Sequence, residues 1–241
     1  MRKKRTKREV FGESLNFEFN FYRLHSYSLR KENHSDFVRL LCYFGHTIPE
    51  MPEPGYSSSL AEHTFSIYTL LEALNTLELQ TNSRPFDAIL LSTCYGGTPG
   101  NIEALSKYSK YIVASPVRLH LSYFYLNREE IENISKTNVY HILQDMTQRE
   151  FNRLQSFVMT EIGISIYDTD ITKSYLTGFM LKNRGSITSR LNTIYSQYID
   201  CLSFPSYRDQ LQCKGVSSLF RDSKFSINPC SNHSGWACRS G

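Results

Sequence analysis

Residues 86–97 read FDAILLSTCYGG, and this stretch decides the fold that the sequence predicts. A short apolar run ends abruptly at Cys94, and two glycines follow almost at once. An earlier run, FVRLLCYFGH at residues 37–46, stops in the same way at Gly45 and His46. Apolar runs that stop at a reactive side chain are typical of strands in an α/β sheet, which offers functional groups at its carboxyl edge. We therefore predict an α/β fold, with a mainly parallel sheet between two layers of helices.

The two reactive residues have a spacing that favours nucleophilic catalysis. His46 and Cys94 are 48 positions apart. A thiol is a poor nucleophile until it loses its proton, and a nearby imidazole can accept that proton. In caspases the histidine precedes the catalytic cysteine by about 50 residues. The sequence thus indicates a Cys-His dyad.

Together these segments resemble the clostripain family of cysteine peptidases, which belongs to the same clan as the caspases. In that family one strand ends in a Gly-His-Gly-like turn, and the next core strand ends in Asp-Ala-Cys with the nucleophile. Here the matching segments are Gly45-His46-Thr47 and Ser92-Thr93-Cys94. Further similarity, within roughly residues 37–185, lies at Phe86–Ile89, Tyr111–Pro116 and Gly163–Asp168.

The resemblance implies a caspase-like fold and a cysteine endopeptidase that acts on peptides or proteins without a cofactor. Cys94 would be the nucleophile and His46 the base. Backbone N–H groups at Thr47 and Tyr95 would hold the oxyanion. Ser92 would line the substrate pocket, because residues two apart on a strand share a face.

Asp168 ends a later strand-like segment and is a second candidate for substrate binding or for orienting His46. A helix cap shared with Asp170 is the simpler interpretation. His63 is the rival to His46 as base, although its place near the start of an expected helix favours a structural or surface role.

The sequence departs from the family pattern at two positions. Ser92 stands where the family has an aspartate that helps to form an acidic pocket, so specificity for Arg or Lys side chains is not carried over. Thr47 replaces the second glycine of the histidine turn. The chain is therefore interpreted as a divergent member, and the alternative is a catalytically inactive interaction module on the same fold.

Periodicity predicts further elements around these two strands. The helices are expected after Ser59 as far as about Leu77, near Asn101, from Asn127 to Met146, from Thr169 or Asp170 onward, and from about Ile187 to Leu202. The remaining strands are expected at Leu15–Phe21, Tyr111–Ala114 and Ile162–Tyr167.

We expect three regions along the chain. Residues 1–36 form a basic tail with a partial β segment, residues 37–202 the catalytic domain, and residues 203–241 an irregular extension that contains cysteines. Clan members usually place at least two strands before the one that carries the histidine. Only 36 residues precede Phe37 here, so we expect a shortened or truncated N-terminus.

The composition is typical of a globular protein with a packed core. Among 241 residues, 40% are hydrophobic and 13% aromatic, which is enough for a packed core. The net charge of +4 is concentrated in the basic run at residues 2–8, which we interpret as a solvated tail and not as a nucleic-acid site. No apolar segment follows this run and no window reaches the ~18 apolar residues of a membrane span, so we expect a cytoplasmic location.

The remaining cysteines suggest no metal site. Cys213, Cys230, His233 and Cys238 are close in number to a zinc set, but no Cys-x-x-Cys pair occurs among them. Cys42 lies within an apolar run and is expected to be an inert core thiol. Sequence motifs of nucleotide-binding loops and of metallopeptidases are absent.

Overall fold

The structure of the chain is a computed structural model. It describes residues 38–45, 47–49, 53–54, 64–76, 85–119, 124–177, 214–227, 232–233, 235–236 and 238–239. The chain divides into two compact units, of which the smaller comprises residues 1–35 and 49–78 and the larger residues 36–48 and 79–241. The expected strand at 15–21 and the expected helix at 187–202 lie outside the described residues.

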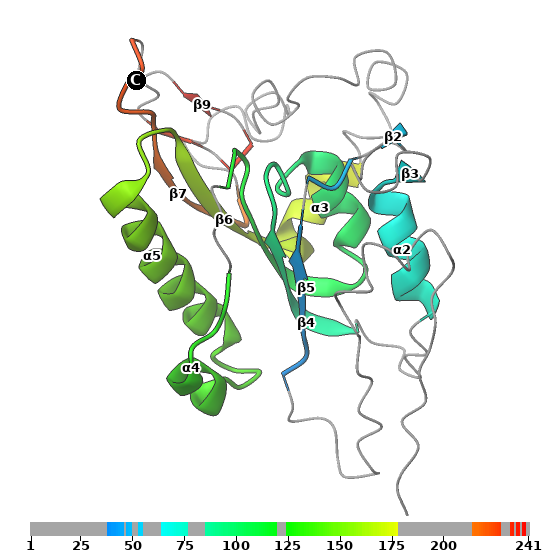
Figure 1. Cartoon of the computed structure of the whole chain (residues 1–241). Helices are drawn as coiled ribbons and strands as arrows, with labels where there is room; N and C mark the ends of the chain where they lie inside the picture. Colours follow the sequence, from blue (N-terminus) through cyan, green and yellow to red (C-terminus); the bar gives the residue numbers. More distant parts are fainter. Residues whose placement is uncertain are drawn as a thin grey trace, which may run out of the picture. The chain divides into compact units, whose positions relative to one another are not determined.

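The larger unit contains a five-stranded sheet with the strand order β1-β4-β5-β6-β7 (Figure 1). Its strands are β1 Leu40–Phe44, β4 Phe86–Ser92, β5 Ser109–Ala114, β6 Ile162–Asp168 and β7 Val216–Arg221. The pairings β1–β4 and β4–β5 are parallel, whereas β6 is antiparallel to both of its neighbours. The sheet is therefore mixed, with four of these five strands running in one direction.

The two strands that the sequence analysis started from are confirmed as parallel neighbours. Leu40 pairs with Ala88, and Phe44 pairs with Ser92. From Ala88 to Ser92 every residue of β4 is buried, without an alternation of buried and exposed positions. This pattern is expected for a central strand that is covered on both faces.

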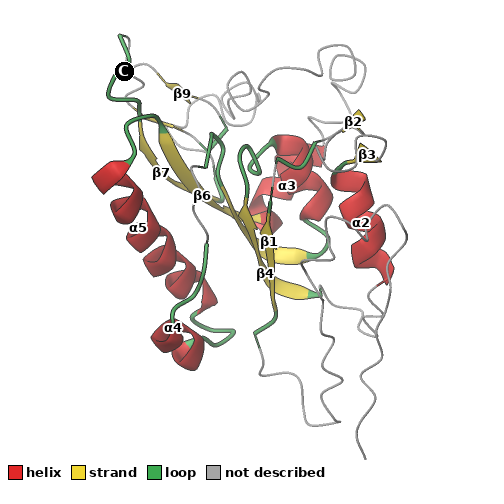
Figure 2. Cartoon of the chain, viewed as in Figure 1, coloured by secondary structure: helices red, strands yellow, loops and turns green. Residues whose placement is uncertain are grey.

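Helices of the larger unit lie on both faces of the sheet (Figure 2). On one face are α4 Arg128–Asn133 and α5 Val139–Phe157, and on the other are α3 Pro99–Leu105 and a helix over residues 169–177. The α/β prediction is confirmed by this arrangement.

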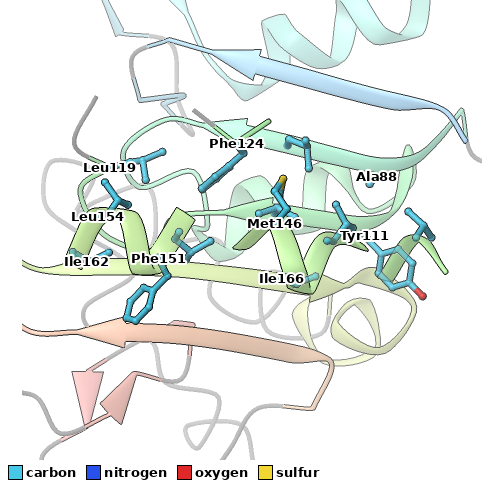
Figure 3. Packing of buried hydrophobic residues seen from close by; sticks show 14 of the residues in the cluster. Ala88, Tyr111, Leu119, Phe124, Met146, Phe151, Leu154, Ile162 and Ile166 are labelled. Carbon is cyan, nitrogen blue, oxygen red and sulfur yellow. The ribbon is translucent and has the colours of Figure 1, made fainter. Parts of the chain in front are cut away.

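The core beneath α5 is built from one helix face and three strands. α5 buries a stripe at helical spacing that contains Val139, Leu143, Met146 and Leu154. Figure 3 shows Met146 and Leu154 of this stripe packed against residues of the sheet. The buried cluster comprises Ala88, Leu90, Tyr111, Val113, Leu119, Phe124, Val139, Leu143, Met146, Phe151, Leu154, Val158, Ile162, Ile164 and Ile166.

The expected helix from Asn127 to Met146 is wrong in one respect, since two helices occupy this region. α4 begins with a capping box, in which Asn127 and Glu130 each accept a hydrogen bond from the other's backbone N–H. The chain then turns at Asn138, whose side chain accepts from Ser135 N (2.7 Å) and donates to Asn133 O (2.9 Å). An asparagine that binds its own neighbouring backbone competes with a continuous helix.

β7 is a strand that the sequence analysis did not predict. It lies within residues 203–241 and pairs with β6 from Ile162↔Arg221 to Tyr167↔Val216. Only Val216 of its six residues is buried, so the segment lacks the apolar alternation by which strands are recognised. Nearby, Asn232–His233 (β8) and Cys238–Arg239 (β9) form a two-stranded antiparallel pair.

The described part of the smaller unit contains one helix and a short strand pair. Glu53–Pro54 (β2) is antiparallel to Thr64–Phe65 (β3), and α2 spans Ile67–Thr76. The expected helix therefore begins later than Ser59, because the chain is still extended at Phe65. Ser59 and His63 lie outside the described residues.

Candidate functional site

Cys94 lies in a turn directly after the carboxyl end of β4. The turn covers residues 94–97 and leads through Thr98 into α3. Cys94 is partly buried and packs at the margin of the apolar core. The thiol therefore sits at the sheet edge where the sequence predicted it, and some of its surface is accessible to solvent.

The sulfur of Cys94 contacts the main chain of Leu119. Leu119 N–H donates to Sγ over 3.3 Å, and the thiol in turn lies 3.6 Å from Leu119 O. An N–H donor stabilises a thiolate, whereas a carbonyl acceptor stabilises the protonated thiol. The same backbone segment can thus accommodate either protonation state of Cys94.

The turn after Cys94 is tied to the segment that follows β5. Tyr95 N–H donates to Val117 O (2.9 Å), and Gly97 N–H donates to Ser115 O (3.0 Å). Tyr95 has a φ of 52°, in the left-handed region that side chains rarely adopt. Its hydroxyl accepts from Nε of Arg118 (3.3 Å), so hydrogen bonds hold both the main chain and the side chain of Tyr95.

The turn is also supported from beneath by Tyr167 of β6. The Tyr167 hydroxyl donates to Gly235 O (2.8 Å) and to Gly97 O (3.3 Å), and burial raises its pKa, which keeps the donor proton in place. A Cβ on Gly97 would lie 2.3 Å from this oxygen. Only glycine therefore fits at this position without displacing the Tyr167 hydroxyl.

Two backbone donors of the Cys94 turn point to no acceptor within the described part of the chain. These are the N–H groups of Cys94 and Gly96. The N–H of Thr47 likewise has no acceptor among the described residues. The N–H of Tyr95, which the sequence analysis named as an oxyanion donor, is engaged with Val117 instead. Around the thiol, Cys94 N–H is accordingly the better candidate for that role.

The segment that carries His46 reaches the same edge of the sheet, although His46 itself lies outside the described residues. Phe44 pairs with Ser92, and Gly45 N–H donates to Ser92 O over 3.4 Å. Both contacts are made with Ser92, two residues before Cys94. The residue immediately before His46 is thus adjacent to the Cys94 turn.

Ser92 is buried, with 6% of its surface exposed. Its Oγ accepts the backbone N–H of Phe124 over 2.7 Å. This hydrogen bond holds the start of the 124–127 segment against the sheet. The described contacts of Ser92 are therefore structural.

Asp168 lies at the opposite edge of the sheet from Cys94. It pairs with Tyr111, and Tyr111 pairs with Ala88 at the beginning of β4. Ser92, the last residue of β4, follows Ala88 by four residues, which corresponds to about 13 Å along the strand, and Cys94 lies beyond it. This placement favours a structural role for Asp168 over substrate binding or the orientation of His46. Its Oδ1 accepts the N–H of Asp170 (3.0 Å), as the helix-cap alternative predicts.

Cys42 behaves as the inert thiol that the sequence analysis expected. It lies inside β1 opposite Leu90, and burial raises its pKa to about 11. At neutral pH this thiol is almost entirely protonated and is a weak nucleophile.

Within the described residues no three or more His, Cys, Asp or Glu side chains are grouped to hold a metal ion. The side chains of Cys213, Cys230, His233 and Cys238 lie outside that part of the chain. None of the described helices is long and apolar enough to cross a membrane.

Sequence reasoning missed the contribution of Leu119. It acts through its main chain, and a main-chain donor leaves no trace in the side-chain pattern. The supporting contacts of Tyr167 with Gly97 were missed for a similar reason, because they join residues 70 positions apart.

Solved structures with a similar arrangement include three cysteine proteases. One is a clostripain from Bacteroides thetaiotaomicron ATCC 29148 in complex with a peptide inhibitor, with 17% identity, a TM-score of 0.49, and coverage of 78% of this chain and 89% of that one. Another is a secreted C11 cysteine protease from Bacteroides thetaiotaomicron, with 15% identity, a TM-score of 0.45, and coverage of 67% and 49%. The third is an inactive zymogen C11 protease from Parabacteroides distasonis, with 19% identity, a TM-score of 0.41, and coverage of 56% and 35%.

The last two proteins are matched over half of their own length or less. No protein-family model matches the sequence, and no curated protein matches it. All three TM-scores lie below 0.5.

Proposed function

We propose that this protein is a cysteine endopeptidase in which Cys94 is the nucleophile and His46 is the general base and acid. The observation that supports it most directly is the surroundings of Cys94. A partly accessible thiol lies beyond a strand end and accepts a backbone N–H, and the N–H of Cys94 itself has no acceptor among the described residues. Nucleophile and oxyanion donor then meet at one point, as acyl transfer requires.

In the proposed reaction His46 takes the proton of the Cys94 thiol, and the thiolate attacks the carbonyl carbon of the scissile peptide bond. Cys94 N–H, assisted by Thr47 N–H, holds the oxyanion of the tetrahedral intermediate. His46 returns the proton to the leaving nitrogen as the C–N bond breaks. Water then hydrolyses the thioester, which releases the acid and regenerates the thiol.

The proposed substrates are peptides or proteins, and no preference for Arg or Lys is expected. Ser92 is neutral and its Oγ is engaged with Phe124 N–H. The exposed cation Arg118 lies against the turn, because its Nε donates to the Tyr95 hydroxyl. This positive charge disfavours a basic substrate side chain beside Cys94.

The alternative is an inactive interaction module, and one contact favours it. The Cys94 thiol lies within hydrogen-bonding distance of Leu119 O, an arrangement that stabilises the unreactive protonated form. Under this alternative the purified protein would bind peptides without turning them over.

The deciding experiment is hydrolysis of a fluorogenic peptide library by the wild type and by Cys94→Ala, His46→Ala and Cys42→Ala. Loss of either dyad side chain is expected to lower the rate by several orders of magnitude, as in other dyads and triads. Cys42→Ala serves as the matched control and should retain activity. Turnover that survives Cys94→Ala would exclude the proposed mechanism, and absence of turnover in the wild type would favour the alternative.

A further inference from the structure

Two hydrogen bonds hold the backbone on either side of His46. Before it, Gly45 N–H donates to Ser92 O (3.4 Å). After it, Ile48 O accepts from the side-chain amide Nδ2 of Asn101 (3.2 Å). The partners are Ser92, two residues before Cys94, and Asn101, seven residues after it. The histidine segment is thus fastened to both flanks of the Cys94 turn.

Asn101 is an unusual residue for its position. Its side chain is fully buried, with 0% exposed, and its Oδ1 has no hydrogen-bond partner in the part of the chain that the structure describes. A buried amide with an unsatisfied oxygen is unfavourable for stability, so an apolar residue of the same shape is not excluded by folding alone. The contact that the amide does make is the one with Ile48 O, 53 positions away in the sequence.

Asn101 lies in the first turn of α3, whose backbone is held by a cap and a proline. Thr98 caps α3 by accepting the N–H of Asn101 over 3.2 Å, and Pro99 occupies the first helical turn. At the other end of the contact, the side chain of Ile48 is itself buried, with 1% exposed. Movement of the histidine segment relative to Cys94 would break the contact between two buried groups.

We propose that Asn101 is a positioning residue, which fixes the backbone beside His46 relative to Cys94 and so sets the geometry of the dyad. This inference rests on the proposed function. A misplacement of about 1 Å in a reacting pair can lower a rate by roughly a hundredfold, so a single anchoring hydrogen bond is enough to matter. Asn101 acts through the backbone at Ile48 and not on the substrate.

The test is the pH dependence of iodoacetamide alkylation at Cys94, followed by mass spectrometry in the wild type and in Asn101→Leu. Leucine has nearly the shape of asparagine and removes the unsatisfied oxygen together with the donor. A well-placed His46 promotes alkylation by accepting the thiol proton. The variant is expected to show an alkylation midpoint at a higher pH than the wild type, and a roughly tenfold slower rate at pH 6.

A matched control removes a buried hydrogen bond far from Cys94. Thr169 is fully buried, and its Oγ1 donates to Ser109 O (2.6 Å) and Lys110 O (3.0 Å) at the other edge of the sheet. Thr169→Val should lower the thermal midpoint and leave the alkylation profile of Cys94 unchanged. Asn101→Ala, which removes the amide without adding bulk, is measured in parallel in case the leucine variant does not fold.

His46→Ala separates the two proposals. If it shifts the wild-type midpoint and folded Asn101 variants do not, the positioning role of Asn101 is overturned and the dyad stands. If His46→Ala leaves the midpoint unchanged, there is no coupled pair to position, and both proposals are overturned. A shift in the Asn101 variants and in His46→Ala, without one in Thr169→Val, supports the positioning role.

Discussion

Cys42 and Cys94 lie at the margin of the same apolar core, yet their surroundings differ in kind. Both are partly buried and pack against the cluster beneath α5. Cys42 sits within β1, where burial is the cause of a pKa raised to about 11. Cys94 sits just past the end of β4, where the N–H of Leu119 reaches its sulfur. Similar burial is therefore combined with different hydrogen-bonding surroundings.

The difference shows what a strand end provides. Within a sheet, the backbone donors and acceptors are consumed by the ladder between strands, so a thiol there meets only apolar neighbours. Beyond the strand end the main chain turns, and some of its N–H groups are free to face a side chain. A cysteine at the carboxyl edge can use these donors, and a cysteine four residues earlier in a neighbouring strand cannot.

The largest expected effect is the difference in alkylation rate between the two thiols. With a pKa of about 11, Cys42 carries roughly one part in ten thousand as thiolate at pH 7. We expect Cys94 to be alkylated by iodoacetamide at least about a hundredfold faster, as measured by mass spectrometry after short pulses. Cys94→Ala should abolish the fast phase and Cys42→Ala should preserve it. Equal alkylation rates for both residues would show that the surroundings of Cys94 do not make its thiol more reactive than that of Cys42.

The pH dependence of Cys42 supplies the control for that measurement. Because its pKa is raised, the thiolate fraction should rise about tenfold per pH unit above pH 7 and level off only near 11. In the Cys94→Ala background the alkylation rate of Cys42 should follow this rise for as long as tryptophan fluorescence shows a folded protein. A plateau near pH 8 would mean that Cys42 is not desolvated.

A smaller effect is expected when the support of the Cys94 turn is disturbed. In Gly97→Ala the new methyl group would lie 2.3 Å from the Tyr167 hydroxyl, and overpacking of this kind lowers the free energy of unfolding by about 1–3 kcal/mol. Urea unfolding can be followed by Trp236, the only tryptophan of the chain, which is buried and lies 4.8 Å from the Tyr167 ring, measured between ring centroids. Cys94 should also react more slowly while Cys42 is unaffected.

The double variant Gly97→Ala/Tyr167→Phe identifies the cause. Removal of the hydroxyl leaves Cζ as the nearest ring atom, at 3.1 Å. The two substitutions together should therefore cost less stability than the sum of the single variants. Strict additivity would show that the hydroxyl is not what excludes a side chain at position 97.

The smallest effect is expected at the start of α3. Thr98 accepts the N–H of Asn101 with its Oγ1, and loss of such a cap usually lowers the free energy of unfolding by about 1 kcal/mol. Thr98→Ala should show this loss in urea unfolding, and Thr98→Ser, which keeps the hydroxyl, should recover most of it. A serine variant as unstable as the alanine variant would point to the methyl group instead of the cap.

Much of the fold could be predicted from local pattern. The apolar runs around Leu41 and Leu90 identified two strands, the Ile162, Ile164 and Ile166 alternation identified a third, and residues near Asn101 correctly began a helix. These signals are local because burial of a strand or a helix face imposes its own period on the sequence. The edge strand β7 has a single buried residue and so escaped detection.

By itself, the sequence determined that Cys94 follows one strand and that His46 follows another, since an apolar run and its end are properties of consecutive residues. Only the tertiary structure decided the direction of β6, and with it the placement of Asp168 far from Cys94. The connection from β5 to β6 contains two helices and is long enough for either direction, so no local pattern selects one. The contacts of Leu119 with Cys94 and of Asn101 with Ile48 join segments 25 and 53 residues apart, and such pairings exist only once the chain has folded.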